Sequence, residues 1–217
     1  MGAIARSAAN LITTSGVVLK GAVNNDSFDN VTALPSAFSE DGITLISSQT
    51  ASASASISFT TGLTSTYKAY KFVFSNIHTS SDGYDFKFNL STDAGSNYNV
   101  TKTTTAFDAG HNEADSATNL SYDTARDLAQ STSDQIIATN LGTDNDQNAS
   151  GSLILFNPSS TTYVKHFISN MNSYEYDDRT RVFYVAGYAN TTSAVNAIRF
   201  KFDTGNFDGT IYLYGIK

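Results

Sequence analysis

Two runs of alternating aromatic residues between Lys68 and Leu90 constrain the fold more than any other feature of the sequence. Aromatic side chains occupy every second position of each run: Tyr70, Phe72 and Phe74, then Tyr84, Phe86 and Phe88. Because successive side chains of a strand point to opposite faces, each run has one aromatic face and one more polar face. The polar break at residues 79–83 ends in Asp82-Gly83, which favours a turn. The stretch therefore predicts a β-hairpin whose aromatic face needs a second sheet to cover it.

Runs of strand length recur from Gly42 to the end of the chain. The runs that we expect to form strands cover residues 43–47, 51–60, 98–101, 151–156, 163–168, 182–188, 194–202 and 209–216. We expect 163–168 to pair with 151–156 across the Asn157-Pro158 turn. About nine or ten short strands at this spacing are typical of a sandwich. The sequence therefore predicts an all-β fold, an antiparallel β-sandwich of jelly-roll-like type, over residues 40–217.

Residues 103–150 are the least regular part of this predicted domain. They are mostly polar and show no sustained apolar stripe of helical period, although Ala125 to Ala129 fits one helical turn. A segment of this length between strands is either functional or a second layer of short strands. Both alternatives are compatible with the sequence.

Residues 1–39 differ in composition from the rest, with small side chains and few large apolar ones. Too little apolar surface recurs here to build a separate core. We predict an extended or partly helical N-terminal arm and linker, with a short helix near Ala5 to Ile12, which orders by docking on another surface. A disordered leader is the alternative. The side chains expected to make the attachment are Ile4, Arg6, Leu11 and Ile12.

The charge and composition of the chain exclude several functions. Its net charge is −7 and its pI is about 4.7. No basic cluster exists beyond Arg179 and Arg181, so we expect no nucleic-acid partner. The chain has no cysteine, which excludes disulfides and thiolate metal sites. No apolar stretch reaches the ~20 residues of a membrane helix and no export signal is recognisable, so we expect no membrane insertion.

Oxygen ligands at alternate positions suggest a calcium loop at Asp144, Asp146 and Asn148. The EF-hand pattern fails, because Ala149 stands at the position of the required Gly and Leu155 at that of the bidentate Glu. A calcium site at the edge of the sheet is one interpretation. A plain turn is favoured, because Asn and Asp form turns without a metal. We expect no other cofactor.

Two tyrosines alternate with acidic residues in a presumed loop near residue 175. The candidate residues for binding a glycan or a protein partner are Tyr174, Tyr176, Asp177, Asp178 and Arg179. Exposed tyrosine rings stack on sugar faces and carboxylates accept sugar hydroxyl protons, and the same composition also suits a protein contact. A solvated loop in which Arg179 pairs with Asp177 is the simpler alternative. Paired carboxylates are also the groups of a glycosidase, if their separation fits.

His111 is the histidine with the most acidic neighbours in the sequence, Asp108, Glu113 and Asp115. A histidine beside carboxylates can hold a metal ion or act as a base. No second histidine at metal-binding spacing and no serine-centred motif accompanies it. We therefore expect a surface histidine and no catalytic residue in this chain.

Three stretches together resemble a group of bacteriophage virion proteins that are common in phages of aquatic bacteria and are described as tail-fibre-like or as structural proteins. They are Ser65 to His78 with Asp82-Gly83, then Gly142 to Gly151 continuing into Phe156 to Thr162, and the closing Gly209 to Ile216. The likeness covers about residues 40 to 217. It implies a β-sandwich displayed on a virus particle, with no catalytic residues. The chain departs from tail fibres proper in having no long coiled-coil or β-helical shaft, which leaves a head-decoration or head-fibre role open.

From this resemblance we expect a non-enzymatic virion component that is assembled in the host cytoplasm. The N-terminal arm is similar to the segments by which such proteins attach to a capsid or tail, and a homotrimer is the expected oligomer. The alternative is a carbohydrate-binding module that recognises a host surface glycan. A third alternative, a glycan-cleaving enzyme, needs two carboxylates facing each other across a groove.

Overall fold

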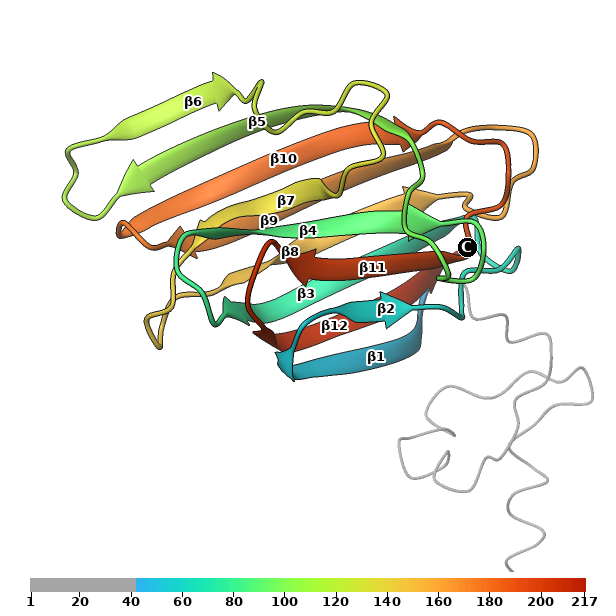
Figure 1. The fold of residues 1–217 in the computed structure, drawn as a ribbon, viewed down its shortest axis with the longest axis horizontal. Coiled ribbons are helices and arrows are strands. Elements are labelled where there is room, and N and C mark those ends of the chain that lie inside the picture. Colours follow the sequence, from blue (N-terminus) through green and yellow to red (C-terminus); the bar gives the residue numbers. More distant parts are fainter. Residues whose placement is uncertain (1–41) are drawn as a thin grey trace, which may run out of the picture. The chain divides into compact units, whose positions relative to one another are not determined.

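The computed structural model describes residues 42–217, and within this range every regular element is a β-strand (Figure 1). The strands are β1 (Ile43–Ser54), β2 (Ile57–Phe59), β3 (Ala69–Thr79), β4 (Tyr84–Ser91), β5 (Lys102–Asn112), β6 (Thr118–Tyr122), β7 (Gln135–Leu141), β8 (Ala149–Phe156), β9 (Lys165–Glu175), β10 (Arg179–Ala189), β11 (Ala197–Phe202) and β12 (Phe207–Ile216). All pairs are antiparallel. The prediction of an all-β antiparallel fold is confirmed for these residues. The predicted arm of residues 1–39, with its attachment residues Ile4, Arg6, Leu11 and Ile12, lies outside the described range.

The strands form one 12-stranded sheet that is nearly closed into a barrel. One run of neighbours, which we call the long run, is β1-β12-β3-β8-β9-β10-β5-β6, and the short run is β7-β4-β11-β2. A single residue pair, Leu141 with Glu175, joins β7 to β9 and so connects the two runs. At the other side, the Gln49 side chain of β1 donates a hydrogen bond to the carbonyl of Ser58 in β2 at 2.9 Å.

Aromatic side chains fill the core between the two runs. Phe200 of β11 lies at their centre, with its ring centroid 5.0 to 6.5 Å from those of neighbouring rings. These neighbours are Phe59, Phe72, Phe74, Phe86 and Phe88. Tyr70 is also buried, and its hydroxyl donates to the carbonyl of Thr64 at 2.8 Å. The alternation in the sequence therefore identified the buried faces of β3 and β4, apart from the exposed Tyr84.

The predicted hairpin between these two strands is wrong. β3 pairs with β12 and β8, whereas β4 pairs with β7 and β11. The two strands face each other across the core, where the rings of Phe74 and Phe86 meet edge to face at 5.6 Å. Each aromatic face thereby helps to cover the other. A hydrogen-bonded hairpin places both faces on the same side of one sheet, where neither can cover the other.

Of the two alternatives for the irregular segment 103–150, strands are present: it holds most of β5 together with β6 and β7, which belong to the same 12-stranded sheet. Residues 124–126 form a turn that is closed by a hydrogen bond from the Arg126 amide to the carbonyl of Asp123, and residues 125–129 contain no helical turn. The predicted pairing of 151–156 with 163–168 is confirmed, with Ile154 opposite Ile168. Within residues 42–217, no helix exists that is long and apolar enough to cross a membrane.

Candidate functional site

The hairpin loop between β9 and β10 is the centre of the candidate binding site. Glu175 pairs with Arg179, which leaves Tyr176–Asp178 as the loop. Asp178 has a φ of 57°, a left-handed conformation that Asp adopts more readily than most residues, and its amide donates to the carbonyl of Glu175 at 3.2 Å. Tyr174 lies in β9, so the predicted loop is correct at its centre and too long at both ends.

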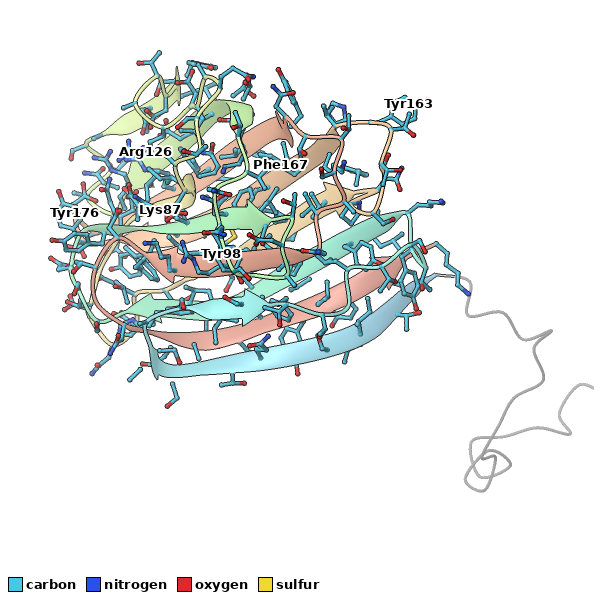
Figure 2. The ribbon with its side chains drawn as sticks, turned by 45° about the vertical axis from the view of Figure 1, so that its right-hand side comes forward. Lys87, Tyr98, Arg126, Tyr163, Phe167 and Tyr176 are labelled. Atoms are coloured by element: carbon cyan, nitrogen blue, oxygen red, sulfur yellow. The ribbon has the colours of Figure 1, made fainter. Side chains whose placement is uncertain are left out.

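Three of the predicted residues, Tyr176, Asp177 and Asp178, are exposed at this loop. The Arg179 guanidinium lies 3.4 Å from the Asp177 carboxylate, which confirms the expected ion pair. Tyr176 is fixed by its amide, which donates to the carbonyl of Asn140 at 3.1 Å, while its side chain remains 52% exposed. Figure 2 shows Tyr176 at the end of the molecule opposite Tyr163.

An open hollow of about 410 Å³ lies beside the loop. Its lining comes from the facing ends of β5, β9 and β10 and from the loop after β5: His111, Asn112, Glu113, Asn172, Ser173, Tyr174 and Thr180. His111, Thr180 and Tyr174 form one row across the three strands, because they occupy matching register positions. The Glu113 amide donates to the carbonyl of Asp178 at 2.9 Å and ties the β5–β6 loop to the hairpin.

Tyr174 is held in this hollow as a hydrogen-bond donor. Its hydroxyl donates to the Asp178 carboxylate at 3.3 Å. The pKa of Tyr174 is raised to about 12. The largest cause is loss of hydration, followed by the hydrogen bond and charge of Glu113 and by the charge of Asp178. Beside it, the Asn172 amide group donates to the Thr180 hydroxyl at 2.9 Å. A ligand in the hollow therefore meets a ring, amide groups, hydroxyls and carboxylates.

The strand geometry separates His111 from one of its acidic neighbours in the sequence, Asp108. His111 points outward from β5, and its Nε2 lies 3.0 Å from the Asp115 carboxylate, with both side chains at least half exposed. Asp108 points inward on the same strand and is buried. The sequence grouped these residues because they are close in number, but the alternation of a strand sends them to opposite faces.

Beneath the loop, two buried carboxylates share one cation. Arg181 forms ion pairs with Asp108 and with Glu175, the latter at 2.7 Å. Thr139 donates to Glu175 at 2.7 Å and Asn119 donates to Asp108 at 2.6 Å. Burial raises the pKa of Glu175, and hydrogen bonds from Arg181 and Thr139 oppose that effect. Both carboxylates are satisfied by groups of the protein and are turned away from the outer surface.

The predicted metal ligands lie in a turn between β7 and β8. The Gln147 amide donates to the carbonyl of Asp144 at 2.9 Å, and the Gln147 side chain accepts from the Asp144 amide at 3.2 Å. Asp144 and Asp146 are exposed, and Asn148 donates to the backbone carbonyl of Asp146 at 3.2 Å. Among residues 42–217, no three His, Cys, Asp or Glu side chains are grouped as a metal site. The local hydrogen bonds match the favoured turn interpretation.

A second feature was missed by the sequence analysis: the outward face of the long run carries exposed apolar side chains. They are Ile43, Leu45, Phe107, Leu120, Tyr122, Phe156 and Ile168, and we call them the outer apolar face. Register places two of them, Leu45 and Ile168, in one row with Tyr214, Lys71 and Ile154 across β1, β12, β3, β8 and β9. The rings of Phe107 and Tyr184 stack at 4.9 Å with an interplanar angle of 13°.

The outer apolar face is also hollowed. A shallow depression of about 430 Å³ lies where β8, β9 and β10 adjoin, and its lining includes the exposed Phe156, His166 and Ile168 and the half-buried Tyr188. The signal for this face was present in the sequence as apolar residues at the positions between buried ones. It could be recognised only once the register had placed those positions side by side.

Comparison of the chain with protein-family models, curated proteins and solved structures finds no match in any of the three.

Proposed function

We propose that this protein is a non-enzymatic structural component of a bacteriophage particle, displayed on its surface and attached through residues 1–39. The observation that carries the proposal is the outer apolar face. Contiguous exposed apolar surface on a folded domain is a feature of protein–protein interfaces. The resemblance described for the sequence supplies the virion context.

In this proposal the long and short runs act as the two layers of a jelly-roll-like sandwich. The aromatic core packs between the two layers, and the end of the domain that carries the β9–β10 loop faces solvent. The outer apolar face contacts sister subunits in a homotrimer, since closed cyclic symmetry is usual for homo-oligomers. The arm contacts the capsid or the tail. Assembly takes place in the host cytoplasm.

The experiment that tests the proposal is immunogold labelling of intact particles with an antibody against residues 42–217, viewed by electron microscopy. Label on the head makes the protein a head-decoration or head-fibre component. Label on the tail makes it a tail-fibre-like component and turns attention to host recognition. Particles that carry no label, from preparations whose lysate contains the protein, contradict the proposal.

A second function, recognition of a host surface glycan, is supported by the hollow at Tyr174. A ring beside amide and carboxylate groups is the chemistry that binds a sugar, in which apolar faces alternate with hydroxyls. In this second proposal, the glycan-binding site is centred on the hollow and not on the tip of the β9–β10 loop. Asn172, His111 and Glu113 line the hollow together with the predicted Tyr174.

Binding of purified host surface polysaccharide to immobilised full-length protein tests this second function. If the hollow binds sugar, Tyr174→Ala should weaken binding by about tenfold or more, because it removes one aromatic contact and one hydrogen bond. Tyr163→Ala is the matched control, because Tyr163 is 71% exposed and lies at the opposite end of the molecule (Figure 2). Equal binding by both variants contradicts a glycan site in the hollow. New reducing ends in the polysaccharide would instead indicate an enzyme.

A further inference from the structure

A lysine and an asparagine meet in the interior at the start of β5. Lys102 is fully buried and Asn89, in β4, is 1% exposed. The Lys102 Nζ donates to the Asn89 Oδ1 at 2.7 Å and to the Val100 carbonyl at 2.8 Å. The lysine amine thus lies against a side-chain amide in a site from which water is excluded.

The surroundings of the two side chains favour reaction between them. Burial lowers the pKa of Lys102 to about 8, so a sizeable fraction of the amine is neutral near neutral pH and can act as a nucleophile. The Leu90 amide donates to the Asn89 Oδ1 at 2.9 Å, where negative charge develops when the amide carbon is attacked.

The Asp134 carboxylate is the group that can carry protons from the Lys102 amine to the Asn89 amide nitrogen. Its Oδ1 accepts a hydrogen bond from the Asn89 Nδ2 at 2.8 Å, and its charge acts on Lys102. Its carboxylate is held in place by Lys201 at 3.3 Å and Arg199 at 3.6 Å. The carboxylate therefore lies at the amide nitrogen that has to leave.

We propose that Lys102 and Asn89 form an intramolecular isopeptide bond after the chain has folded. The Lys102 Nζ gives up a proton to Asp134 and attacks the Asn89 Cγ, and the bond from Cγ to Nδ2 then breaks. Protons released from Nζ pass through Asp134 to Nδ2, which leaves as ammonium. One lysine ammonium and one primary amide become one secondary amide and one ammonium ion, so atoms and charge balance without an oxidant or a co-reactant.

The bond has a structural consequence that backbone pairing does not provide for β4 and β5. β4 belongs to the short run and β5 to the long run, and the two strands do not pair with each other. A covalent bond between them joins the two runs directly. The link also closes the connection from residue 89 to residue 102 into a ring, which restricts the unfolded chain as a disulfide does.

Lys165 provides an internal comparison. It is also buried in the interior, and it lies on the other side of Ala189, which pairs with both lysines in the adjoining strands. Its Nζ donates to the backbone carbonyls of Tyr163 and Thr191 at 2.9 and 3.0 Å. Backbone carbonyls offer no amide group that can leave without cutting the chain, so Lys165 is not expected to react.

Mass spectrometry of the intact full-length protein tests the proposal. The measured mass should be lower than the mass of the sequence by one ammonia, about 17 Da. Lys102→Arg, Asn89→Ala and Asp134→Ala should each restore the mass expected for the variant sequence, whereas Lys165→Arg should keep the deficit. A wild-type chain at its full mass overturns the proposal, and this outcome does not depend on whether any variant folds.

Tryptic digestion locates the bond. Trypsin cleaves after Lys87, Lys102 and Arg126 in this region. The bond blocks cleavage at Lys102, so residues 88–126 should appear as one peptide that lacks one ammonia and yields no backbone fragments between Asn89 and Lys102. A succinimide at an asparagine has the same mass deficit but leaves Lys102 cleavable and survives Lys102→Arg. Either of those results contradicts the isopeptide bond.

Discussion

Glu175 shows how single residues connect the candidate site to the stability of the domain. It ends β9 directly before the exposed loop, yet its side chain is buried and paired with Arg181. Removing a carboxylate from water disfavours its charged form, and here that effect outweighs the stabilisation by Arg181 and Thr139, so the pKa rises. Arg181 also pairs with Asp108 and so divides its charge between two anions.

This raised pKa predicts a pH dependence of the free energy of unfolding. In the interval above 4.5, the ordinary pKa of a glutamate, the folded state binds more protons at Glu175 than the unfolded state does. The contribution of Glu175 is therefore fully present below pH 4.5 and is lost as the pH rises through the raised pKa. Urea unfolding at a series of pH values should show wild type losing stability relative to Glu175→Gln across this interval. A constant difference between the two proteins contradicts a raised pKa.

At the scale of elements, the main result is that β3 and β4 are partners across the core and are not paired in a sheet. Phe200 of β11 contacts rings from both strands, with Phe74 at 5.0 Å and Phe86 at 6.1 Å. Phe200 is therefore the ring on which the contact between the two runs is centred, beside the direct contact of Phe74 with Phe86. Phe107 of β5 lies at an exposed position between the buried Ala106 and Asp108.

We predict that Phe200→Ala lowers the free energy of unfolding by about 3–5 kcal/mol, because it removes a fully buried ring and leaves a cavity. Phe107→Ala is the matched control. Phe107 is 43% exposed and stacks on Tyr184, so its removal should cost about 0.5–1.5 kcal/mol. Chemical denaturation of both variants measures the difference. Equal losses would mean that the ring cluster is not the centre of the core.

The sequence predicts the buried face of a strand better than the partner of that strand. Period-two alternation identified Phe72, Phe74, Phe86 and Phe88 as core residues because burial depends on the strand itself. The pairing of β3 and β4 depends on distant strands, and a short polar break alone does not determine it. β5 was missed because its inward positions hold small or polar residues such as Thr104, Ala106 and Asp108.

Only part of the candidate site could be predicted from the sequence. Tyr176 and the ion pair of Asp177 with Arg179 follow from local composition. The hollow does not, because His111 and Tyr174 are brought together only by the register of β5, β10 and β9. The site of Lys102 and Asn89 gave no sequence signal either, because neither residue belongs to a recognisable motif.

At the scale of the whole molecule, we propose that residues 1–39 attach the protein to the particle and that residues 42–217 form the domain displayed on its surface. Deletion of residues 1–25 should therefore abolish incorporation into particles while leaving the thermal unfolding temperature of the domain nearly unchanged. Incorporation is measured by immunoblotting of purified particles, and unfolding by calorimetry. A large drop in the unfolding temperature would mean that the deleted residues belong to the core.

The position of β12 has a consequence for the order in which the protein can be built. This last strand lies between β1 and β3, and its end meets the beginning of the described chain, where the Lys217 amide donates to the carbonyl of Gly42 at 3.5 Å. During synthesis, β1 and β3 are made before β12. Until β12 is available, each of them has one edge without a hydrogen-bonded neighbour. The sheet is complete only when β12 has been made, so a chain that lacks β12 has two exposed strand edges, one on β1 and one on β3.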